Sequence, residues 1–129
     1  MTKESSKKVA DEMLKLASEA LEESKILLER DKLRGTISRA YYAMFDASRA
    51  LLYSRGVETK PHQGVITTLS ESFIKTKELD TWFSKTIRTT FNLRQASDYE
   101  IEVELGRETV EQMVKDAEKR GVLKKGKSV

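Results

Sequence analysis

The segment from Ser38 to Gly56, SRAYYAMFDASRALLYSRG, constrains the fold most, because it presents two different apolar faces when it is read as a helix. One face is formed by small side chains that let another backbone approach closely: Ala40, Ala43, Ala47 and Ala50. The neighbouring face is bulkier: Tyr41, Met44, Phe45, Ser48, Leu51 and Leu52. Together these faces cover well over half of the helix circumference. The sequence therefore predicts a central helix with neighbours on more than one side.

The amino-acid composition limits the possible fold classes and excludes some kinds of metal site. The 129 residues are 38% hydrophobic and 35% charged with one proline, which is typical of a single helical domain. The absence of cysteine excludes disulfides and thiolate metal sites, and a single histidine argues against a zinc or di-iron centre. We therefore expect no cofactor and no metal. A polar N-terminus and the lack of a long apolar run predict a cytoplasmic protein.

Periodicity predicts an all-α fold, an antiparallel up-and-down bundle of about five helices with one of them short. Asp31 is a candidate N-cap for the second helix, and Gly56 is a good stop residue for it. We expect one domain over residues 1–121 and a basic, flexible tail over residues 122–129, which either frays in solvent or holds nucleic acid non-specifically. The five expected helices cover residues 6–30, 31–55, 62–75, 79–97 and from about 105 to a stop at Gly121.

Arg94 is the most conspicuous polar residue. It follows Phe83, Ile87 and Phe91 at four-, four- and three-residue steps, so it continues a stripe that is otherwise apolar. An arginine on such a face needs a carboxylate, a partner chain or a bound anion. Asp98 lies one helical turn further on and can reach it. Two interpretations remain open: an Arg94–Asp98 ion pair that closes one end of the bundle, or a guanidinium group that binds phosphate and is held by Asp98.

Several other polar residues are candidates for the same site. Arg39 and Arg49 interrupt the apolar pattern of the central helix and are possible phosphate ligands. Tyr41 and Tyr42 are adjacent, so one should be buried while the other faces a groove or a second subunit. Tyr99 is either a core ring or a polar group at the rim of a cleft. His62, at the start of the third helix, would matter for catalysis only if the fold brings it near Arg94.

Four segments together resemble the HEPN domain family (higher eukaryotes and prokaryotes nucleotide-binding). The resemblance covers roughly residues 10–117 and rests on RAYYAMF at 39–45, ALL at 50–52, KPHQG at 60–64 and LRQASDY at 93–99. It implies an antiparallel helical bundle that forms a homodimer with a cleft between subunits. It also implies a minimal nucleotidyltransferase as partner, in a toxin–antitoxin or defence module. Active members are metal-independent endoribonucleases with an R-x(4–6)-H motif, in which the arginine binds phosphate and the histidine assists the attack of the ribose 2′-hydroxyl.

Arg94 matches the arginine of that motif, but the permitted histidine positions hold Tyr99, Glu100 and Ile101. A phenol is a poor general base at neutral pH because it keeps its proton. The sequence therefore predicts a catalytically degenerate protein that binds nucleotide or RNA phosphate. The predicted site residues are Arg94, Asp98, Tyr99, Arg39, Tyr42 and His62.

Two alternatives to this hypothesis remain open. One is an active ribonuclease in which Tyr99 or His62 acts with Arg94. The other is a purely structural or adaptor bundle, in which Arg94 and Asp98 form an internal ion pair and the alanine stripe serves only dimerisation.

Overall fold

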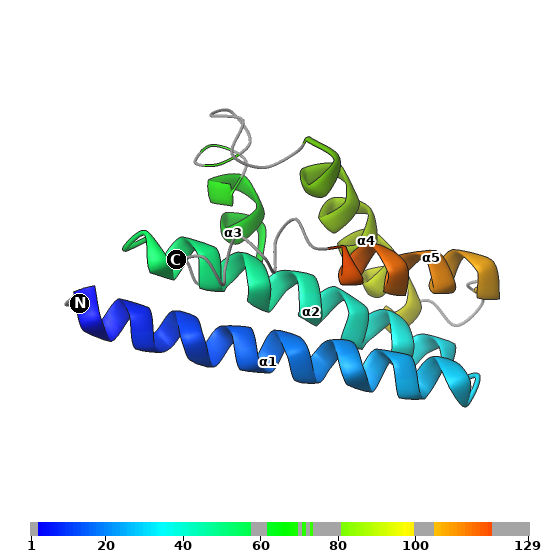
Figure 1. Ribbon diagram of the computed structural model, residues 1–129. Helices are drawn as coiled ribbons and strands as arrows, with labels where there is room; N and C mark the ends of the chain where they lie inside the picture. Colours follow the sequence, from blue (N-terminus) through cyan, green and yellow to red (C-terminus); the bar gives the residue numbers. More distant parts are fainter. Residues whose placement is uncertain are drawn as a thin grey trace.

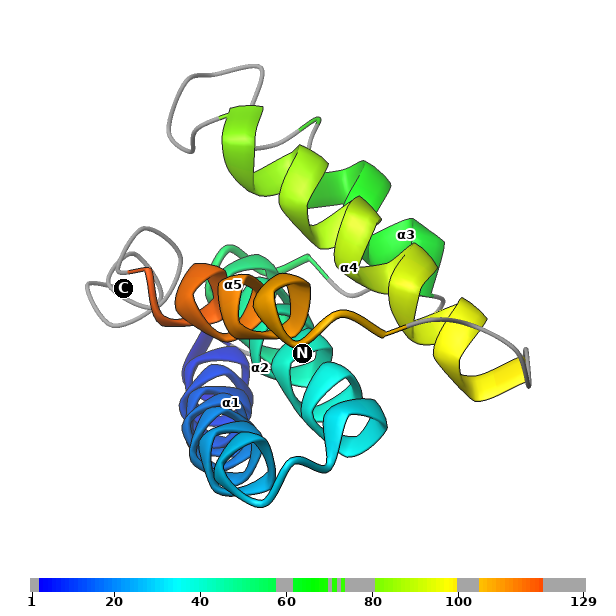
Figure 2. The ribbon, with the colours of Figure 1, turned by 90° about the vertical axis from the view of Figure 1, so that its right-hand side faces the viewer.

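The computed structural model describes residues 3–57, 62–69, 71, 73, 81–99 and 105–119. Within these residues the chain is all-α, as predicted, and no strand occurs. The helices are α1 (Lys3–Glu29), α2 (Leu33–Ser54), α3 (His62–Leu69), α4 (Thr81–Tyr99) and α5 (Arg107–Glu118). α1 and α2 run side by side, and α3, α4 and α5 lie beyond α2 in Figure 1. Seen from the end of the α1–α2 pair, α3 and α4 lie to one side of it and α5 lies across it (Figure 2).

The central position predicted for α2 is confirmed, since α2 contacts each of the other four helices. Its bulky face contributes fully buried side chains, among them Tyr41, Leu51 and Leu52. These side chains pack against buried residues of α3 and α4, including Val65, Leu69 and Ile87. A core organised around one helix explains why the two apolar stripes of that helix were the strongest signal in the sequence.

The small-residue face of α2 is buried inside the chain. Ala40, Ala43, Ala47 and Ala50 are each at most 2% exposed, and the first three belong to the same core cluster as Ala17 and Ala20 of α1. Gly35 marks a close approach, because a Cβ atom there would lie 3.1 Å from Leu27 Cδ1. The alternative that this stripe serves only dimerisation is therefore wrong, since no second copy can reach buried alanines.

Asp31 does not cap α2 as we expected. It lies in the left-handed region (φ 57°) and ends α1: its N–H donates to the carbonyl of Leu28 (3.0 Å), and the Lys32 N–H donates to that of Leu27 (2.9 Å). The N-cap of α2 is Lys32, which makes no side-chain capping bond. A tight reversal needs a left-handed residue, and aspartate tolerates that conformation better than most residues do. The Asp31 carboxylate instead accepts a hydrogen bond from Arg107 of α5 (2.7 Å).

The predicted stop of α2 at Gly56 is confirmed. Gly56 is left-handed (φ 77°), its N–H donates to the carbonyl of Tyr53 (2.9 Å), and the Val57 N–H donates to that of Leu52 (2.9 Å). These two bonds form a Schellman motif, which satisfies carbonyls that the helix end leaves unpaired. Val57 then packs against the core.

One further boundary differs from the prediction, because α4 extends to Tyr99, so Arg94, Asp98 and Tyr99 belong to one continuous helix. α3 is α-helical from His62 to Leu69, and the predicted end of this helix near residue 75 lies outside the described residues. The expected start of the fourth helix at Leu79 and the proposed tail over residues 122–129 lie outside the described residues. None of the helices in the described part is long and apolar enough to cross a membrane.

Gly56 allows a direct test of this helix end. Gly56→Ala is expected to lower the free energy of unfolding by about 1–2 kcal/mol, because an L-residue at positive φ is strained. No neighbouring atom lies within 4 Å of the added Cβ, so the loss would come from the backbone alone. Gly56→Asn should lose less, because asparagine tolerates this region. Urea unfolding of the three proteins measures the difference, and an alanine variant as stable as the native protein would contradict the assignment.

Candidate functional site

Arg94 lies in α4 on the side that faces α2, and the predicted ion pair with Asp98 is present. Arg94 Nε is 3.3 Å from Asp98 Oδ2, one helical turn along. The Nε atom is buried and its N–H is not aligned for a hydrogen bond to any described residue. The Arg94 side chain is only 18% exposed. Asp98 therefore balances the charge of the guanidinium group without satisfying its hydrogen bonds.

Two tyrosine rings of α2 hold the Arg94 guanidinium group in place. Its central carbon lies 5.5 Å from the ring centroid of Tyr41 and 5.1 Å from that of Tyr42. Tyr41 is fully buried while Tyr42 is partly exposed, so the predicted difference in burial is confirmed, and the groove or second subunit expected at Tyr42 stays a prediction. Burial raises the pKa of the Tyr41 hydroxyl well above its usual value; the charge of Arg94 opposes this, and Tyr42 and Asp46 add to it. Tyr41 therefore stays neutral and contacts the cation through its ring.

Arg39 joins the same group of side chains. Its guanidinium carbon lies 5.2 Å from the Tyr42 ring centroid, and its Nη1 is 3.3 Å from Glu23 Oε1 of α1. Both Arg39 and Arg94 therefore contact one ring, although they come from different helices. We call Arg94, Asp98, Tyr41, Tyr42 and Arg39 the Arg94 site. Among the described residues, none accepts a hydrogen bond from the terminal nitrogens of Arg94, so these donors are free to bind an anion.

The other two predicted site residues are not shown at this site. Tyr99 is 77% exposed, and no described residue forms a hydrogen bond or ring contact with it. Five residues along an α-helix turn the side chain by about 140°, so Tyr99 and Arg94 project from different sides of α4. His62 is the first residue of α3, and its side chain lies outside the described residues. The roles predicted for these two residues stay predictions.

A polar stripe on α2 extends the Arg94 site along that helix. The α2 stripe consists of Arg39, Tyr42, Asp46, Arg49 and Tyr53. Arg49 Nη1 lies 3.9 Å from Asp46 Oδ1, and its guanidinium carbon lies 5.6 Å from the Phe45 ring centroid and 5.9 Å from that of Tyr53. Arg49 Nε is buried, and no described residue accepts a hydrogen bond from it. The sequence analysis did not identify this stripe, although its alternating three- and four-residue steps indicate one face of a helix.

The Asp46 carboxylate is the buried acid of this stripe, since its side chain is only 13% exposed. Burial raises the pKa of Asp46 above its usual value, while the nearby charges of Arg49 and Arg39 act in the opposite direction. The fold thus holds a partly desolvated carboxylate between two guanidinium groups.

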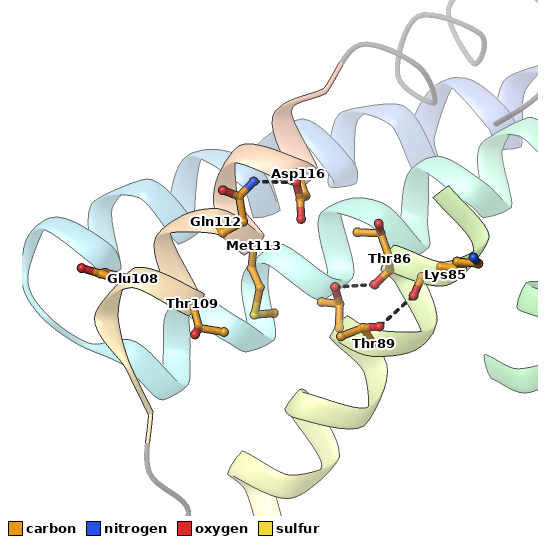
Figure 3. Close-up of a pocket in the computed structure, with 9 residues that line it drawn as sticks. Lys85, Thr86, Thr89, Glu108, Thr109, Gln112, Met113 and Asp116 are labelled. Carbon is orange, nitrogen blue, oxygen red and sulfur yellow. Dashed lines mark hydrogen bonds between the residues drawn. The ribbon is translucent and has the colours of Figure 1, made fainter. Parts of the chain in front are cut away.

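A groove lies elsewhere, away from the Arg94 site. It has a volume of about 560 Å³ and runs between α4 and α5, lined by threonines of both helices and by Lys85, Gln112 and Met113 (Figure 3). Glu108 and Asp116 also line it, so one lysine faces two acids and the groove does not suit a phosphate. A smaller hollow of about 290 Å³ lies between α3 and α4 and contains Arg88, Phe91 and Asn92. No three metal-ligating side chains cluster in the described part of the chain.

Comparisons with known proteins agree on one family. A sequence model of the HEPN domain matches residues 10–123. A protein of Methanocaldococcus jannaschii named "Putative toxin" is 32% identical over 108 residues, which cover 84% of this chain and 74% of that relative. Two proteins of the UPF0332 group are also similar. The one from Thermotoga maritima is 31% identical over 111 residues (86% and 84% of the two chains), and the one from Archaeoglobus fulgidus is 33% identical over 105 residues (81% and 83%).

Asp46 should make stability depend on pH. Because its pKa is raised on folding, the unfolded chain loses this proton at a lower pH than the folded chain does. The stabilisation that Asp46 contributes should therefore fall as pH rises from about 4 through the pKa of the folded state. Asp46→Asn removes this dependence. Urea unfolding of both proteins over a series of pH values should show the native protein losing stability relative to the variant. A relative gain with rising pH would contradict the desolvated carboxylate.

Proposed function

This chain belongs to the HEPN domain family, and we propose that it binds nucleotide or RNA phosphate at the Arg94 site. One observation carries the proposal. The Arg94 guanidinium group is oriented by two tyrosine rings and by Asp98, yet no described residue accepts a hydrogen bond from its terminal nitrogens. A guanidinium group held in this way offers a fixed pair of donors that matches two phosphate oxygens.

The charges around the site support an anionic ligand. α4 carries Lys85, Arg88 and Arg94 against one acid, Asp98, and Arg39 of α2 lies beside the same tyrosine ring. Asp98 balances the charge of Arg94, and Glu23 balances that of Arg39. The cations in excess on α4 are therefore Lys85 and Arg88, so an incoming phosphate would meet a net positive helix while it bonds the terminal nitrogens of Arg94.

The biological setting in this proposal is a toxin–antitoxin-like module with a minimal nucleotidyltransferase as partner. Membership in the family supports it, together with the relative whose name contains the word toxin. In this setting the cleft would present bound RNA or nucleotide, and the partner would regulate that binding. The protein would carry out this role in the cytoplasm without a metal.

We propose that the bound RNA is not cleaved. The positions at which the family motif places its histidine hold Tyr99, Glu100 and Ile101. Tyr99 is exposed and projects from a different side of α4 than Arg94 does, so it is not placed to take a proton at a phosphate bound there. Phosphate binding needs only the donors of Arg94, whereas cleavage also needs a base within hydrogen-bond reach.

Arg94→Gln tests the proposal. The change removes one charge and the paired donors, so affinity for a labelled single-stranded RNA should fall roughly ten- to hundredfold, the range expected for charge-assisted hydrogen bonds. Fluorescence anisotropy measures the affinity, and Lys115→Gln, which removes an exposed charge from α5, is the matched control. The RNA should stay intact in EDTA with either protein.

The opposite results would identify the alternatives. Equal affinity of the native protein and Arg94→Gln, together with a lower melting temperature of the variant, would mean that the arginine only stabilises the bundle. Cleavage of the RNA in EDTA that disappears in Arg94→Gln would mean an active ribonuclease. Circular dichroism of each variant establishes that the helices are intact.

We also propose that two copies associate through the α2 stripe. This stripe carries the buried Nε of Arg49, which has no hydrogen-bond partner among the described residues, and the desolvated Asp46 carboxylate, with the partly exposed Tyr42 and Tyr53 rings beside them. A second copy would supply polar partners and cover the rings, as interfaces rich in tyrosine and arginine do.

Light scattering should therefore show a dimer at about 10 μM, a concentration that populates even a dimer of modest affinity. Arg49→Glu should yield a monomer, because it places a second acid beside Asp46 at the interface. Lys115→Glu, the same charge reversal on the exposed surface of α5, should remain dimeric. A native protein that is monomeric at this concentration would refute the shared interface.

A further inference from the structure

We infer that a second face of α4, turned away from Arg94, is a binding track for single-stranded RNA. This α4 track consists of Arg88, Asn92, Gln95 and Tyr99. The inference rests on the proposed phosphate function and adds the residues that would contact the bases of the RNA. The four positions follow one another at four-, three- and four-residue steps, which places them on one line along the helix over about 16 Å. That length accommodates a few nucleotides.

The charge of this helix face favours a polyanion. From Thr81 to Ser97 the chain contains no acid, whereas it contains Lys85, Arg88 and Arg94. Such a stretch is unusual in a chain with 21 acidic residues, because charges of both signs alternate along α1 and α5. Both Lys85 and Arg88 are exposed. Lys85 also lines the groove that contains Glu108 and Asp116, so the attraction along the track comes mainly from Arg88. A phosphate backbone that lies along α4 would meet no carboxylate of this helix before it reaches Asp98.

Tyr99 supplies a surface on which a base can stack. It is a large aromatic side chain that is 77% exposed, and no described residue contacts its ring or bonds its hydroxyl. An aromatic ring left in solvent at the end of a cationic helix face is the kind of platform that single-stranded nucleic acids use, since every base has a face that stacks. Asn92 and Gln95 lie between Tyr99 and Arg88, and their amides can bond base edges.

The hollow between α3 and α4 gives the track a place for one base. It is lined by Arg88, Phe91 and Asn92 together with Ile66 and Thr67 of α3. Its volume of about 290 Å³ lies at the lower end of the range for ligand pockets, which suits a single base. The Phe91 ring centroid lies 5.6 Å from that of Tyr41, whose ring also contacts Arg94. The hollow and the phosphate ligand are thus joined through two packed rings.

A second copy of the chain is the competing occupant of this face. Two copies that met through the α4 track would bring Lys85 and Arg88 of each against the cations of the other, which is unfavourable. RNA has the opposite charge and also uses the exposed ring and amides. Charge complementarity therefore favours RNA, and a protein contact becomes an outcome of the test.

The test compares the binding of one short, labelled, single-stranded RNA to the native protein, Tyr99→Ala, Arg88→Gln and the control Lys115→Gln. Anisotropy should show that Tyr99→Ala binds roughly tenfold more weakly because one stacked base is lost. Arg88→Gln should bind more weakly and should lower the slope of log affinity against log salt by about 0.7, which corresponds to one phosphate contact fewer. The control should bind like the native protein, and light scattering of each variant should show an unchanged oligomeric state.

Arg94→Gln, measured with the same RNA, separates this inference from the proposed function. If Arg94→Gln loses affinity while Tyr99→Ala and Arg88→Gln bind like the native protein, the track is refuted and the phosphate site stands. If the track variants lose affinity while Arg94→Gln binds normally, the track stands and the phosphate site is refuted. A native protein that binds no RNA refutes the track outright. A change of oligomeric state in the track variants would identify this face as a protein interface and also refute the track.

Discussion

The contact of one guanidinium group with two tyrosine rings links the fold to the site. Arg94 comes from α4 and the rings come from α2, so this contact exists only when α4 is docked on the central helix. Removing a guanidinium group from water is costly unless a carboxylate and ring faces replace the lost solvation. Asp98 and the two tyrosines do so only in part, because the buried Nε has no hydrogen-bond partner among the described residues. Under the proposed function, the terminal nitrogens of Arg94 bind an anion while Asp98 and the tyrosine rings hold the guanidinium group in place.

The sequence predicted the parts of the structure that depend on periodicity along one helix. The central role of α2, its stop at Gly56 and the Arg94–Asp98 pair all follow from three- and four-residue steps or from one turn residue. It did not reveal contacts between helices, because spacing within α4 carries no information about which ring of α2 it meets. Tyr41 was therefore missed as a second ring on Arg94. Asp31 was misassigned because an aspartate between two helices suits the end of one and the start of the next equally well.

In the family motif the arginine binds phosphate and the histidine assists cleavage, and this chain has no histidine at the permitted positions. Arg94 stands at the position of the motif arginine and pairs with Asp98, and the family model matches residues 10–123. Chemistry at that phosphate would need a base on the same side of α4, and Tyr99 projects elsewhere. Under the proposed function, the tyrosine at the end of the helix is therefore better suited to hold a nucleotide than to cleave its neighbour.

The close seam between α1 and α2 has a consequence for how this protein can diverge. Alanines and Gly35 fill that seam, so almost any larger side chain there would force the two helices apart. The exposed positions of α4 are less restricted, because the side chains of Lys85, Arg88, Asn92 and Tyr99 lie in solvent. Substitutions there should therefore disturb the fold less than substitutions in the seam. The chain thus combines a tightly constrained scaffold with a surface that tolerates change.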